Sequence, residues 1–314
     1  MSGVLVLDAA QTRAALDPAR TLAAVRTALV EIARGTVSAP PRIAAQTPTG
    51  LLGAMPAYVP GLGLASKLVS VFAVPGQAGR SSHRGVVALF DEQDGRLLAL
   101  MDAEPITAVR TAAAATLSMR ALASPQRTRI AVIGTGVQAR AQLALLAAVE
   151  GDTEVTVGGR DQARARALAA EHPRGTAAGV EAAVRGADVV FCCTGATEPV
   201  LRASWLAAGA HVSSVGGSHG PELDPATVDG ASLFAEWAGA AASPPPAGAH
   251  ELQGRAARVT LLGAVLDRRH PGRRDPAELT VFKSTGHAAL DVAAAAVVHA
   301  FAHEHGTGTT VNLS

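Results

Sequence analysis

Residues 129–139 read RIAVIGTGVQA, an apolar run that breaks at two glycines and continues into a helix-forming stretch. This pattern predicts a strand, a tight turn and the start of a helix. The spacing of Gly134, Gly136 and Ala139 matches the dinucleotide fingerprint, in which small residues allow the turn, the approach of a pyrophosphate and close helix packing. The N–H groups and dipole at the helix start would hold the phosphates. The stretch therefore predicts a dinucleotide-binding domain.

Composition and charge narrow the class of protein. The chain has 314 residues, of which 48% are hydrophobic and 17% charged, and its formal charge is +1. This length is enough for two domains, and the small charge gives no reason to expect nucleic acid or a membrane as partner. The adjacent Cys192 and Cys193 favour neither a disulfide nor metal binding. Because no signal-like or membrane-spanning run is present, we expect a cytoplasmic location.

The first third of the chain predicts a mostly antiparallel sheet with flanking helices. Apolar periodicity predicts helices at 21–34 and 104–123 and strands at 64–72, 86–90 and 97–101. The turn residues Gln93-Asp94-Gly95 between the last two strands are typical of a hairpin.

From residue 128 the pattern changes to alternating strands and helices. Strands are predicted near 130–133, 154–157, 188–193, 211–215, 232–236 and 279–282, and a last helix from 286 to 305. The charged run from Arg268 to Arg274 is predicted to be a solvated loop rather than a binding patch. The alternation of strands and helices predicts a parallel, doubly wound sheet of the Rossmann type. The predicted fold class is therefore α/β, with a second, mostly antiparallel α+β domain.

The end of the second predicted Rossmann strand indicates which dinucleotide binds. NAD usually meets an acidic side chain there, which accepts a hydrogen bond from the free ribose 2′-hydroxyl. Here the strand is followed by Gly158, Gly159 and Arg160, and a guanidinium suits the 2′-phosphate of NADP. We predict NADP. The alternative is that Arg160 is a solvated residue and Asp161 binds the ribose.

Three cations stand among apolar or small residues before residue 124: Arg42, Lys67 and Arg110. On pattern alone, a strand lysine such as Lys67 more often points to solvent than into a catalytic site. If the three side chains converge, they form an anion pocket suited to a carboxylate.

The histidines give weaker signals. His299 and His303 share a helix face, but no acidic third ligand or HExxH pattern accompanies them, so we expect no metal site. His83, which follows Ser82 at the start of a strand, is the better candidate for a residue that lines a cleft. No GxSxG or Cys/His pattern predicts a nucleophile.

Six ordered motifs resemble the ornithine cyclodeaminase/mu-crystallin family over nearly the whole chain. They are Pro40-Pro41-Arg42, the strand around Lys67, DGRLLA at 94–99, ITAVRTAA at 106–113, GTGVQA at 134–139, and FKSTG at 282–286 followed by Asp291. The resemblance implies a homodimer with a Rossmann domain at 124–291 and a substrate-binding and dimerisation domain built from 1–123 and 292–314. It also implies that Arg42, Lys67 and Arg110 meet the substrate carboxylate and the reacting centre.

Departures from the family pattern distinguish between its activities. In the cyclodeaminases that the chain resembles, an acidic residue comes before the Met-Pro pair in the strand after the Pro-Pro-Arg motif. This chain has Gly53-Ala54-Met55-Pro56 there. The cyclodeaminases also have an aspartate after Val-Gly-Gly that acts as a base, whereas this chain has Ser218. That serine, together with Ser82-His83 and the run 282–284, resembles mu-crystallin and the ketimine or Δ1-pyrroline-2-carboxylate reductases.

These features predict NADPH-dependent reduction of a small cyclic ketimine carboxylate, such as Δ1-pyrroline-2-carboxylate or Δ1-piperideine-2-carboxylate. Reduction needs a hydride donor, a fixed carboxylate and one proton, whereas cyclodeamination needs a base. Arg42 and Arg110 would hold the carboxylate, and Lys67 would protonate or polarise the imine nitrogen. The alternatives are an ornithine or lysine cyclodeaminase, an alanine-type amino-acid dehydrogenase, and a non-catalytic NADP-bound binding protein of mu-crystallin type.

The predicted catalytic residues are Lys67, Arg42 and Arg110, and the predicted partner is a small imine or amino-acid substrate. The predicted cofactor is NADP, with NAD as the alternative. The predicted cofactor-binding residues are Ser82, His83, Arg110, Gly134, Thr135, Gly136, Val137, Gln138, Gly159, Arg160, Asp161, Thr194, Val215 and Ser284.

Overall fold

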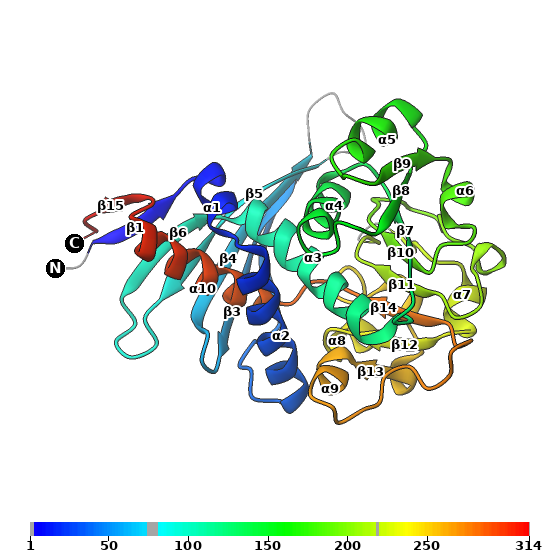
Figure 1. Cartoon of the computed structure of the whole chain (residues 1–314). Coiled ribbons are helices and arrows are strands. Elements are labelled where there is room, and N and C mark those ends of the chain that lie inside the picture. Colours follow the sequence, from blue (N-terminus) through cyan, green and yellow to red (C-terminus); the bar gives the residue numbers. More distant parts are fainter. Residues whose placement is uncertain (1–2, 74–80, 218–219, 314) are drawn as a thin grey trace. The chain divides into compact units, whose positions relative to one another are not determined.

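The computed structural model describes residues 3–73, 81–217 and 220–313 (Figure 1). The chain forms two compact units: unit 1 comprises Met1–Arg110 and His287–Ser314, and unit 2 comprises Thr111–Gly286. These units divide the chain within α3 (Ala103–Leu122) and just before α10 (Ala288–His305), whereas the predicted boundaries lie after residues 123 and 291. The predicted boundaries stay a prediction about functional domains.

Unit 1 is built on a seven-stranded sheet in the order β15-β1-β6-β5-β4-β3-β2. Its strands are β1 (Val4–Leu7), β2 (Ile43–Thr47), β3 (Gly50–Val59), β4 (Gly63–Ala73), β5 (Ser81–Phe90), β6 (Leu97–Asp102) and β15 (Thr309–Val311). β1 and β6 pair in parallel, and the other neighbours are antiparallel. The mostly antiparallel sheet is therefore confirmed, and the predicted hairpin between β5 and β6 contains Gly95, with a φ of +74°.

Helices cover one face of this sheet (Figure 1). They are α1 (Ala9–Ala15), α2 (Pro18–Arg34), the first turns of α3 (Ala103–Leu122), and α10 (Ala288–His305). α2 begins at its cap Asp17 and ends at Gly35, which has a φ of +75°. α10 packs against α2, β3 and β4. Because side chains alternate along a strand, Lys67 of β4 is buried while its neighbour Leu68 is exposed.

Unit 2 is built on an eight-stranded parallel sheet in the order β13-β12-β14-β11-β10-β7-β8-β9. Its strands are β7 (Arg129–Ile133), β8 (Glu154–Gly158), β9 (Gly175–Ala178), β10 (Val189–Cys192), β11 (His211–Ser214), β12 (Ser232–Ala235), β13 (Val259–Leu261) and β14 (Thr280–Lys283). The predicted doubly wound parallel sheet is confirmed, and the order of strands reverses between β7 and β10. The sequence did not predict β9 and β13, which have only four and three residues.

Helices lie on both faces of the unit 2 sheet. They are the rest of α3, α4 (Val137–Val149), α5 (Gln162–Ala169), α6 (Val180–Val184), α7 (Pro225–Asp229), α8 (Gly239–Ala242) and α9 (Leu262–Leu266), with 3-10 turns at Ala203–Trp205, His250–Leu252 and Ala256–Arg258. Ile130 and Val132 of β7 pack in a core with α3, α4 and α5. Ala131 and Ile133 point the other way, into a core with α6, α7 and α8. The period-2 alternation of one strand thus builds both apolar layers.

Residues 268–274 form the loop that the sequence predicts, with Arg268, Arg269 and Arg274 exposed, but Arg273 of this loop is half-buried and points inward. Its Nε donates to the Leu122 carbonyl at 2.6 Å, and its Nη2 donates to the Ala210 carbonyl at 3.2 Å. A run of charges suggested solvent, whereas the guanidinium adds donors to backbone carbonyls of two other segments.

Three further findings bear on the class of protein. Within the described ranges, no helix is both long and apolar enough to cross a membrane. The same part of the chain groups no three His, Cys, Asp or Glu side chains in a way that could hold a metal ion. Cys192 and Cys193 are free and buried, and burial raises the pKa of both thiols well above the usual value. These thiols are therefore protonated and unreactive.

Candidate active site

The glycine-rich turn after β7 has the geometry that its sequence predicts. Gly134 has a φ of +120°, and its N–H donates to the Gly158 carbonyl at 2.9 Å. A Cβ at this position would lie 2.5 Å from the Cys193 carbonyl oxygen. Only glycine therefore fits between β7, β8 and β10 at the point where the order of strands reverses.

The start of α4 is open to an incoming anion. Gly136 is its N-cap and supplies no side-chain hydrogen bond to the first turn. A Cβ added to Gly136 would meet no atom within 4 Å, and Val137 is 54% exposed. Ala139 is buried against β7, so the helix start is held close to the sheet. The uncapped N–H groups and the open space fit a pyrophosphate.

The residues after β8 separate the two possible ribose ligands. The Asp161 side chain caps α5, because its Oδ1 accepts from the N–H groups of Ala163 and Arg164 at 3.0 and 3.1 Å. Arg160 is exposed and makes no hydrogen bond or ion pair with the described part of the chain. A Cβ at Gly159 would lie 3.1 Å from the Thr135 side chain, so this turn packs closely on the glycine-rich turn. Asp161 is therefore engaged within the protein, whereas the Arg160 side chain is open to solvent.

The other predicted cofactor residues of unit 2 lie at the same edge of the sheet. Thr194 follows β10, Val215 follows β11, and Ser284 follows β14. The Ser284 hydroxyl donates to Glu236 Oε2 at 2.9 Å, so this group is already engaged within the protein. Because the carboxyl ends of parallel strands share one edge, these residues and the glycine-rich turn line the same edge.

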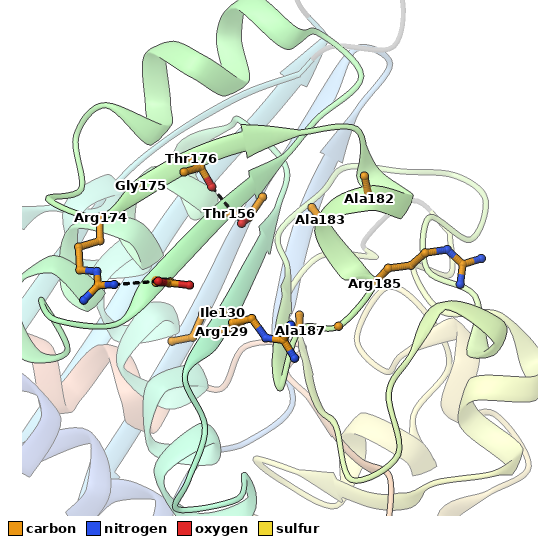
Figure 2. Close-up of a pocket in the computed structure, with 12 residues that line it drawn as sticks. Arg129, Ile130, Thr156, Arg174, Gly175, Thr176, Ala182, Ala183, Arg185 and Ala187 are labelled. Atoms are coloured by element: carbon orange, nitrogen blue, oxygen red, sulfur yellow. Dashed lines mark hydrogen bonds and ion pairs between the residues drawn. The ribbon is translucent and has the colours of Figure 1, made fainter.

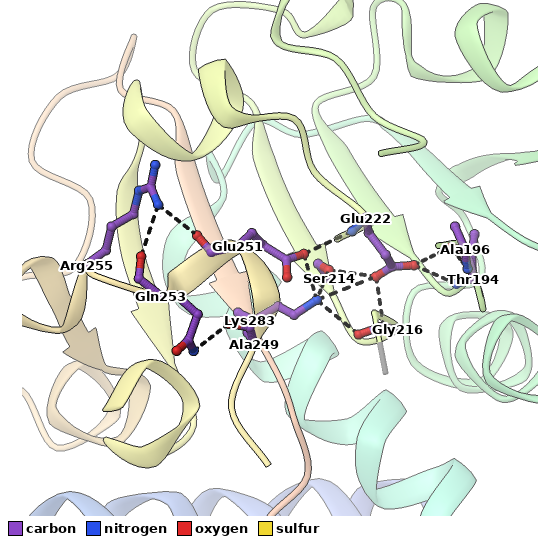
Figure 3. Close-up of polar contacts among 10 residues, drawn as sticks. All are labelled: Thr194, Ala196, Ser214, Gly216, Glu222, Ala249, Glu251, Gln253, Arg255 and Lys283. Atoms are coloured by element: carbon purple, nitrogen blue, oxygen red, sulfur yellow. Dashed lines mark hydrogen bonds and ion pairs between the residues drawn. The ribbon is translucent and has the colours of Figure 1, made fainter. Parts of the chain in front are cut away.

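A buried charged network that the sequence did not predict lies beneath this edge (Figure 3). Lys283 Nζ donates to the Ser214 hydroxyl at 2.7 Å and to Glu251 Oε1 at 3.0 Å. Glu222 is fully buried and accepts from the Ser214 hydroxyl at 2.7 Å and from the Thr194 N–H at 2.7 Å. Lys283, Glu222 and Glu251 stand among apolar residues or glycines in the sequence, which could have indicated that they are buried. The sequence could not show that they pair, because the fold brings them together.

Unit 1 holds a second buried charged cluster. Lys67 Nζ lies 2.8 Å from Asp291 Oδ2, and Arg110 Nε donates to Asp291 Oδ1 at 3.1 Å. Lys67 also approaches the Thr107 hydroxyl at 3.5 Å. Lys67 and Arg110 are each 5% exposed and Asp291 is 2% exposed, so the hypothesis of an outward-pointing Lys67 is wrong. A strand, α3 and α10 together bring these three side chains into one place.

Arg42 contributes its charge to the same cluster. It lies in the exposed segment before β2, and its charge lowers the pKa of both Lys67 and His287. Burial lowers the pKa of Lys67 below its usual value, Asp291 opposes this, and the charges of Arg110 and Arg42 add to the lowering. Burial alone would raise the pKa of Asp291, but Lys67 and Arg110 outweigh it and the pKa is lowered. The structure therefore brings Lys67 and Arg110 onto one ionised carboxylate, and the charge of Arg42 acts on the same lysine.

Two residues of this cluster were not predicted as site residues. Asp291 appeared only as part of a motif, although an acid within an alanine-rich buried helix is itself a signal. His287 caps α10, and its Nδ1 accepts from the Ala289 N–H at 3.3 Å. Burial lowers the pKa of His287 to about 4, with Asp291 opposing and Arg110 and Arg42 adding to the effect. His287 is therefore neutral near pH 7.

The remaining predicted residues lie in other parts of the chain. Ser82 and His83 lie in β5 opposite Phe72 and Val71. Ser218 lies outside the described residues. Thr135 and Gln138 belong to the turn and first helical turn around Gly136.

The structure also contains a cavity of about 460 Å³ at the opposite edge of the unit 2 sheet (Figure 2). Its lining includes Arg129 at the start of β7 and Gly175 at the start of β9. Of its other arginines, Arg174 pairs with Glu154 at 2.8 Å and Arg185 pairs with a glutamate one helical turn earlier. It therefore lies at the amino ends of the strands, away from the glycine-rich turn.

Comparison with known proteins agrees with this geometry. The ornithine cyclodeaminase/mu-crystallin family model matches residues 4–306. The ketimine reductase mu-crystallin of Mus musculus is 34% identical over 255 residues, which cover 80% of each chain. The Δ1-pyrroline-2-carboxylate reductase of Thermococcus litoralis, in complex with NADH and L-proline, aligns with a TM-score of 0.87 at 27% identity and covers 98% of this chain and 100% of that one. An archaeal alanine dehydrogenase dimer with bound NAD aligns with a TM-score of 0.86 at 27% identity and 99% coverage of both chains.

The family match includes both units and the two sites described above. It also includes all six motifs that carried the resemblance in the sequence. The chain belongs to the ornithine cyclodeaminase/mu-crystallin family.

Proposed function

We propose that the protein reduces a small cyclic ketimine carboxylate, of the Δ1-pyrroline-2-carboxylate or Δ1-piperideine-2-carboxylate type, with NADPH. The observation that carries the proposal is the buried cluster of Lys67, Arg110 and Asp291 beside the charge of Arg42. Two relatives described above, a ketimine reductase and a pyrroline-2-carboxylate reductase, support imine reduction as the reaction class.

The charges of the cluster suit a carboxylate substrate. Lys67 and Arg110 share the single carboxylate of Asp291, and Arg42 adds a third positive charge that acts on Lys67, so a bound substrate carboxylate would bring the charges closer to balance. Arg110 uses Nε for Asp291, and a guanidinium has further N–H groups on its two terminal nitrogens with which to hold an anion. We assign carboxylate binding to Arg110 and Arg42.

Lys67 is the proposed proton donor. An imine accepts hydride at carbon more readily when its nitrogen is protonated, and a buried ammonium with a lowered pKa gives up a proton more readily. Asp291 keeps Lys67 charged before the reaction and fixes the position of Nζ. After the transfer, Lys67 is neutral and regains its proton from solvent.

The edge of unit 2 is the proposed cofactor site. The turn at Gly134 and Gly136 would hold the pyrophosphate, and Arg160 would hold the 2′-phosphate of NADPH. Thr194 and Val215 lie at the strand ends on the other side of the strand reversal, where the second mononucleotide of a dinucleotide binds. When bound, the nicotinamide supplies the hydride.

An assay across substrates tests the proposal. NADPH oxidation is followed with Δ1-pyrroline-2-carboxylate, Δ1-piperideine-2-carboxylate, and pyruvate with ammonia or methylamine. We expect turnover with the cyclic imines and formation of proline or pipecolate. Absence of turnover with every imine, despite NADPH binding, would favour the non-catalytic binding protein.

The same preparation tests the cyclodeaminase alternative. Cyclodeamination needs acids that are replaced here by Gly53 and Ser218. A Cβ at Gly53 would make only ordinary contacts, near 3.7 Å, so the missing acid does not result from lack of space. We expect no ammonia from ornithine or lysine with catalytic NAD, and ammonia release would overturn the reductase assignment.

We also propose that the protein is a homodimer located in the cytoplasm. The face of the unit 1 sheet opposite α10 carries an exposed apolar row of Ile43, Leu52, Leu68 and Val86, which are 69%, 52%, 39% and 39% exposed. Exposed apolar patches of this kind mark protein–protein contacts, and a dimer is described for the archaeal alanine dehydrogenase. The free, buried cysteines are consistent with a reducing compartment.

A further inference from the structure

One buried carboxylate joins two loops at the carboxyl edge of the unit 2 sheet. Glu222 has no exposed surface. Its Oε1 accepts from the N–H and the hydroxyl of Thr194, after β10, at 2.7 and 2.6 Å (Figure 3). Its Oε2 accepts from the N–H of Gly216, after β11, at 2.9 Å. Both oxygens are therefore committed to holding the two loops in one arrangement.

Lys283 brings a third strand end into the same arrangement. It lies at the end of β14, with Nζ 3.9 Å from Glu222 Oε2, and donates to the Gly216 carbonyl at 3.0 Å. The Ser214 hydroxyl accepts from Lys283 and donates to Glu222, each at 2.7 Å. Loss of Lys283 would leave the Glu222 carboxylate buried without a counter-ion, which is costly, whereas loss of Glu222 would leave Lys283 paired with Glu251 alone.

The loop after β11 lies directly on this network. A Cβ at Gly216 would be 2.1 Å from the Thr194 carbonyl oxygen and 2.5 Å from Glu222 Oε1. A Cβ at Gly217, where φ is +83°, would be 2.8 Å from Lys283 Nζ. Because glycines place the loop backbone in direct contact with Glu222 and Lys283, a shift of the Glu222 carboxylate would also shift the loop.

These loops belong to the half of the sheet that follows the strand reversal. In dinucleotide folds the strands before the reversal hold the adenosine half, and those after it hold the nicotinamide half. We propose that Glu222 is a positioning residue that presets the loops at Thr194 and Gly216 for the nicotinamide half without touching the cofactor. The inference rests on the proposed cofactor binding of this edge.

Glu222→Gln tests the inference because it keeps the shape and removes the charge. A glutamine amide cannot accept from the Gly216 N–H at the position of Oε2 while Oε1 accepts from Thr194, since one of its ends is a donor. We expect the Kd for NADPH to rise by about tenfold or more in the full-length protein. The Kd for 2′-phospho-ADP-ribose, which lacks the nicotinamide, should stay within about twofold. NADH and ADP-ribose serve as a second pair, so that the result does not depend on cofactor preference.

Two further variants complete the test. Ser214→Ala removes one bond to Glu222 at a fully buried position and should weaken NADPH selectively, by a smaller factor. The matched control is Glu278→Gln, whose carboxylate accepts from the Arg274 N–H at 2.6 Å just before β14, at the amino edge. It should change the Kd of neither ligand.

The outcomes separate the two hypotheses. If Glu222→Gln and Ser214→Ala weaken NADPH and 2′-phospho-ADP-ribose equally, or weaken neither, the positioning role is overturned while the proposed function stands. If the unaltered protein binds neither NADPH nor NADH, the proposed function fails and this inference fails with it. If Glu222→Gln does not fold, selective weakening by Ser214→Ala supports the role and unchanged binding overturns it.

Discussion

Lys67 stands on a strand where neighbouring side chains point to opposite faces, and the local sequence cannot say which face is covered. Its burial follows from α10, which comes from the other end of the chain and brings Asp291 to within 2.8 Å. The three cations could be chosen from sequence because each interrupts an apolar context. Their carboxylate partner could not be chosen in the same way, because Arg110 and Asp291 are 181 positions apart.

Substitutions at Lys67 and Arg42 should separate proton transfer from substrate binding. Lys67→Met keeps the length of the side chain but removes the proton, so turnover should fall by roughly two to four powers of ten while NADPH affinity changes little. Arg42→Lys loses the two-pronged grip and should mainly raise the substrate KM. Steady-state kinetics with direct NADPH titration measure both effects. Near-normal turnover of Lys67→Met would show that the proton comes from elsewhere.

Arg160 should decide the preference between the two cofactors. Arg160→Ala should weaken NADPH by about one to two powers of ten, because a charged contact with the 2′-phosphate contributes roughly 1.5–3 kcal/mol, and should leave NADH almost unchanged. Titration of both cofactors checks this. An equal loss for NADPH and NADH would exclude Arg160 as the phosphate ligand.

At the scale of elements, long periodic segments were predictable and short ones were not. α2, α3, α10 and the strands β4 to β6 follow their apolar spacing and their caps or turns. β9 and β13 are too short to show a period, and they form because neighbouring strands leave an edge to be paired. Within the loop at 268–274, the inward position of Arg273 could not be predicted for a related reason, because the carbonyls that it contacts belong to distant segments.

Arg273 should therefore contribute to stability despite its place in a charged loop. Arg273→Met removes donors from the Leu122 and Ala210 carbonyls and from the Thr280 hydroxyl, bonded at 2.6, 3.2 and 3.1 Å. We expect the free energy of unfolding to fall by roughly 2–4 kcal/mol. Arg274→Met is the matched control, because that guanidinium is exposed, and it should change stability by less than about 0.5 kcal/mol. Urea unfolding of both variants measures the difference, and equal effects would contradict this account.

For the whole molecule, buried histidines should make stability fall in acid. Burial lowers the pKa of His211 from 6.5 to about 3, with Arg273 and Arg127 adding to the effect, and His287 is lowered to about 4. Above about pH 6.5, both histidines are neutral in the folded protein and in the unfolded chain. As the pH falls below this value, these histidines bind protons in the unfolded chain but stay neutral in the folded protein. Each of them therefore lowers the free energy of unfolding, by up to roughly 3–5 kcal/mol once the pH reaches its folded-state pKa.

His211→Gln tests this pH dependence. His211 is held by the hydroxyls of Ser118 and Thr280 at 3.0 and 2.9 Å, and glutamine is polar without titrating. Unfolding free energies at pH 7 and pH 5 should differ less in the variant than in the unaltered protein. An identical difference would show that the acid sensitivity arises at other groups.

The exposed apolar row should determine the oligomeric state. Ile43 of β2 pairs with Ala54 of β3, Ala54 pairs with Leu68 of β4, and Leu68 pairs with Val86 of β5, so these side chains lie side by side across four strands. Leu52 lies two residues before Ala54 on β3 and therefore on the same face. Leu52→Arg on the same face should convert the proposed dimer to a monomer, because it introduces a charge into an apolar contact. Leu313→Arg, at an exposed apolar position near the chain end, is the control. Light scattering gives the mass of each, and a monomeric unaltered protein would refute the proposal.

Unit 1 is assembled from both ends of the chain, which has a consequence for how the protein is made. The ribosome completes Lys67 and Arg110 long before it reaches Asp291, and β1 is made long before its partner β15. Unit 2 is continuous and can fold while the last helix is still being synthesised. Until α10 is released, two cations destined for burial have no counter-ion, and they must stay in water. The nascent protein can therefore complete its dinucleotide-binding unit before Lys67 is buried beside Asp291.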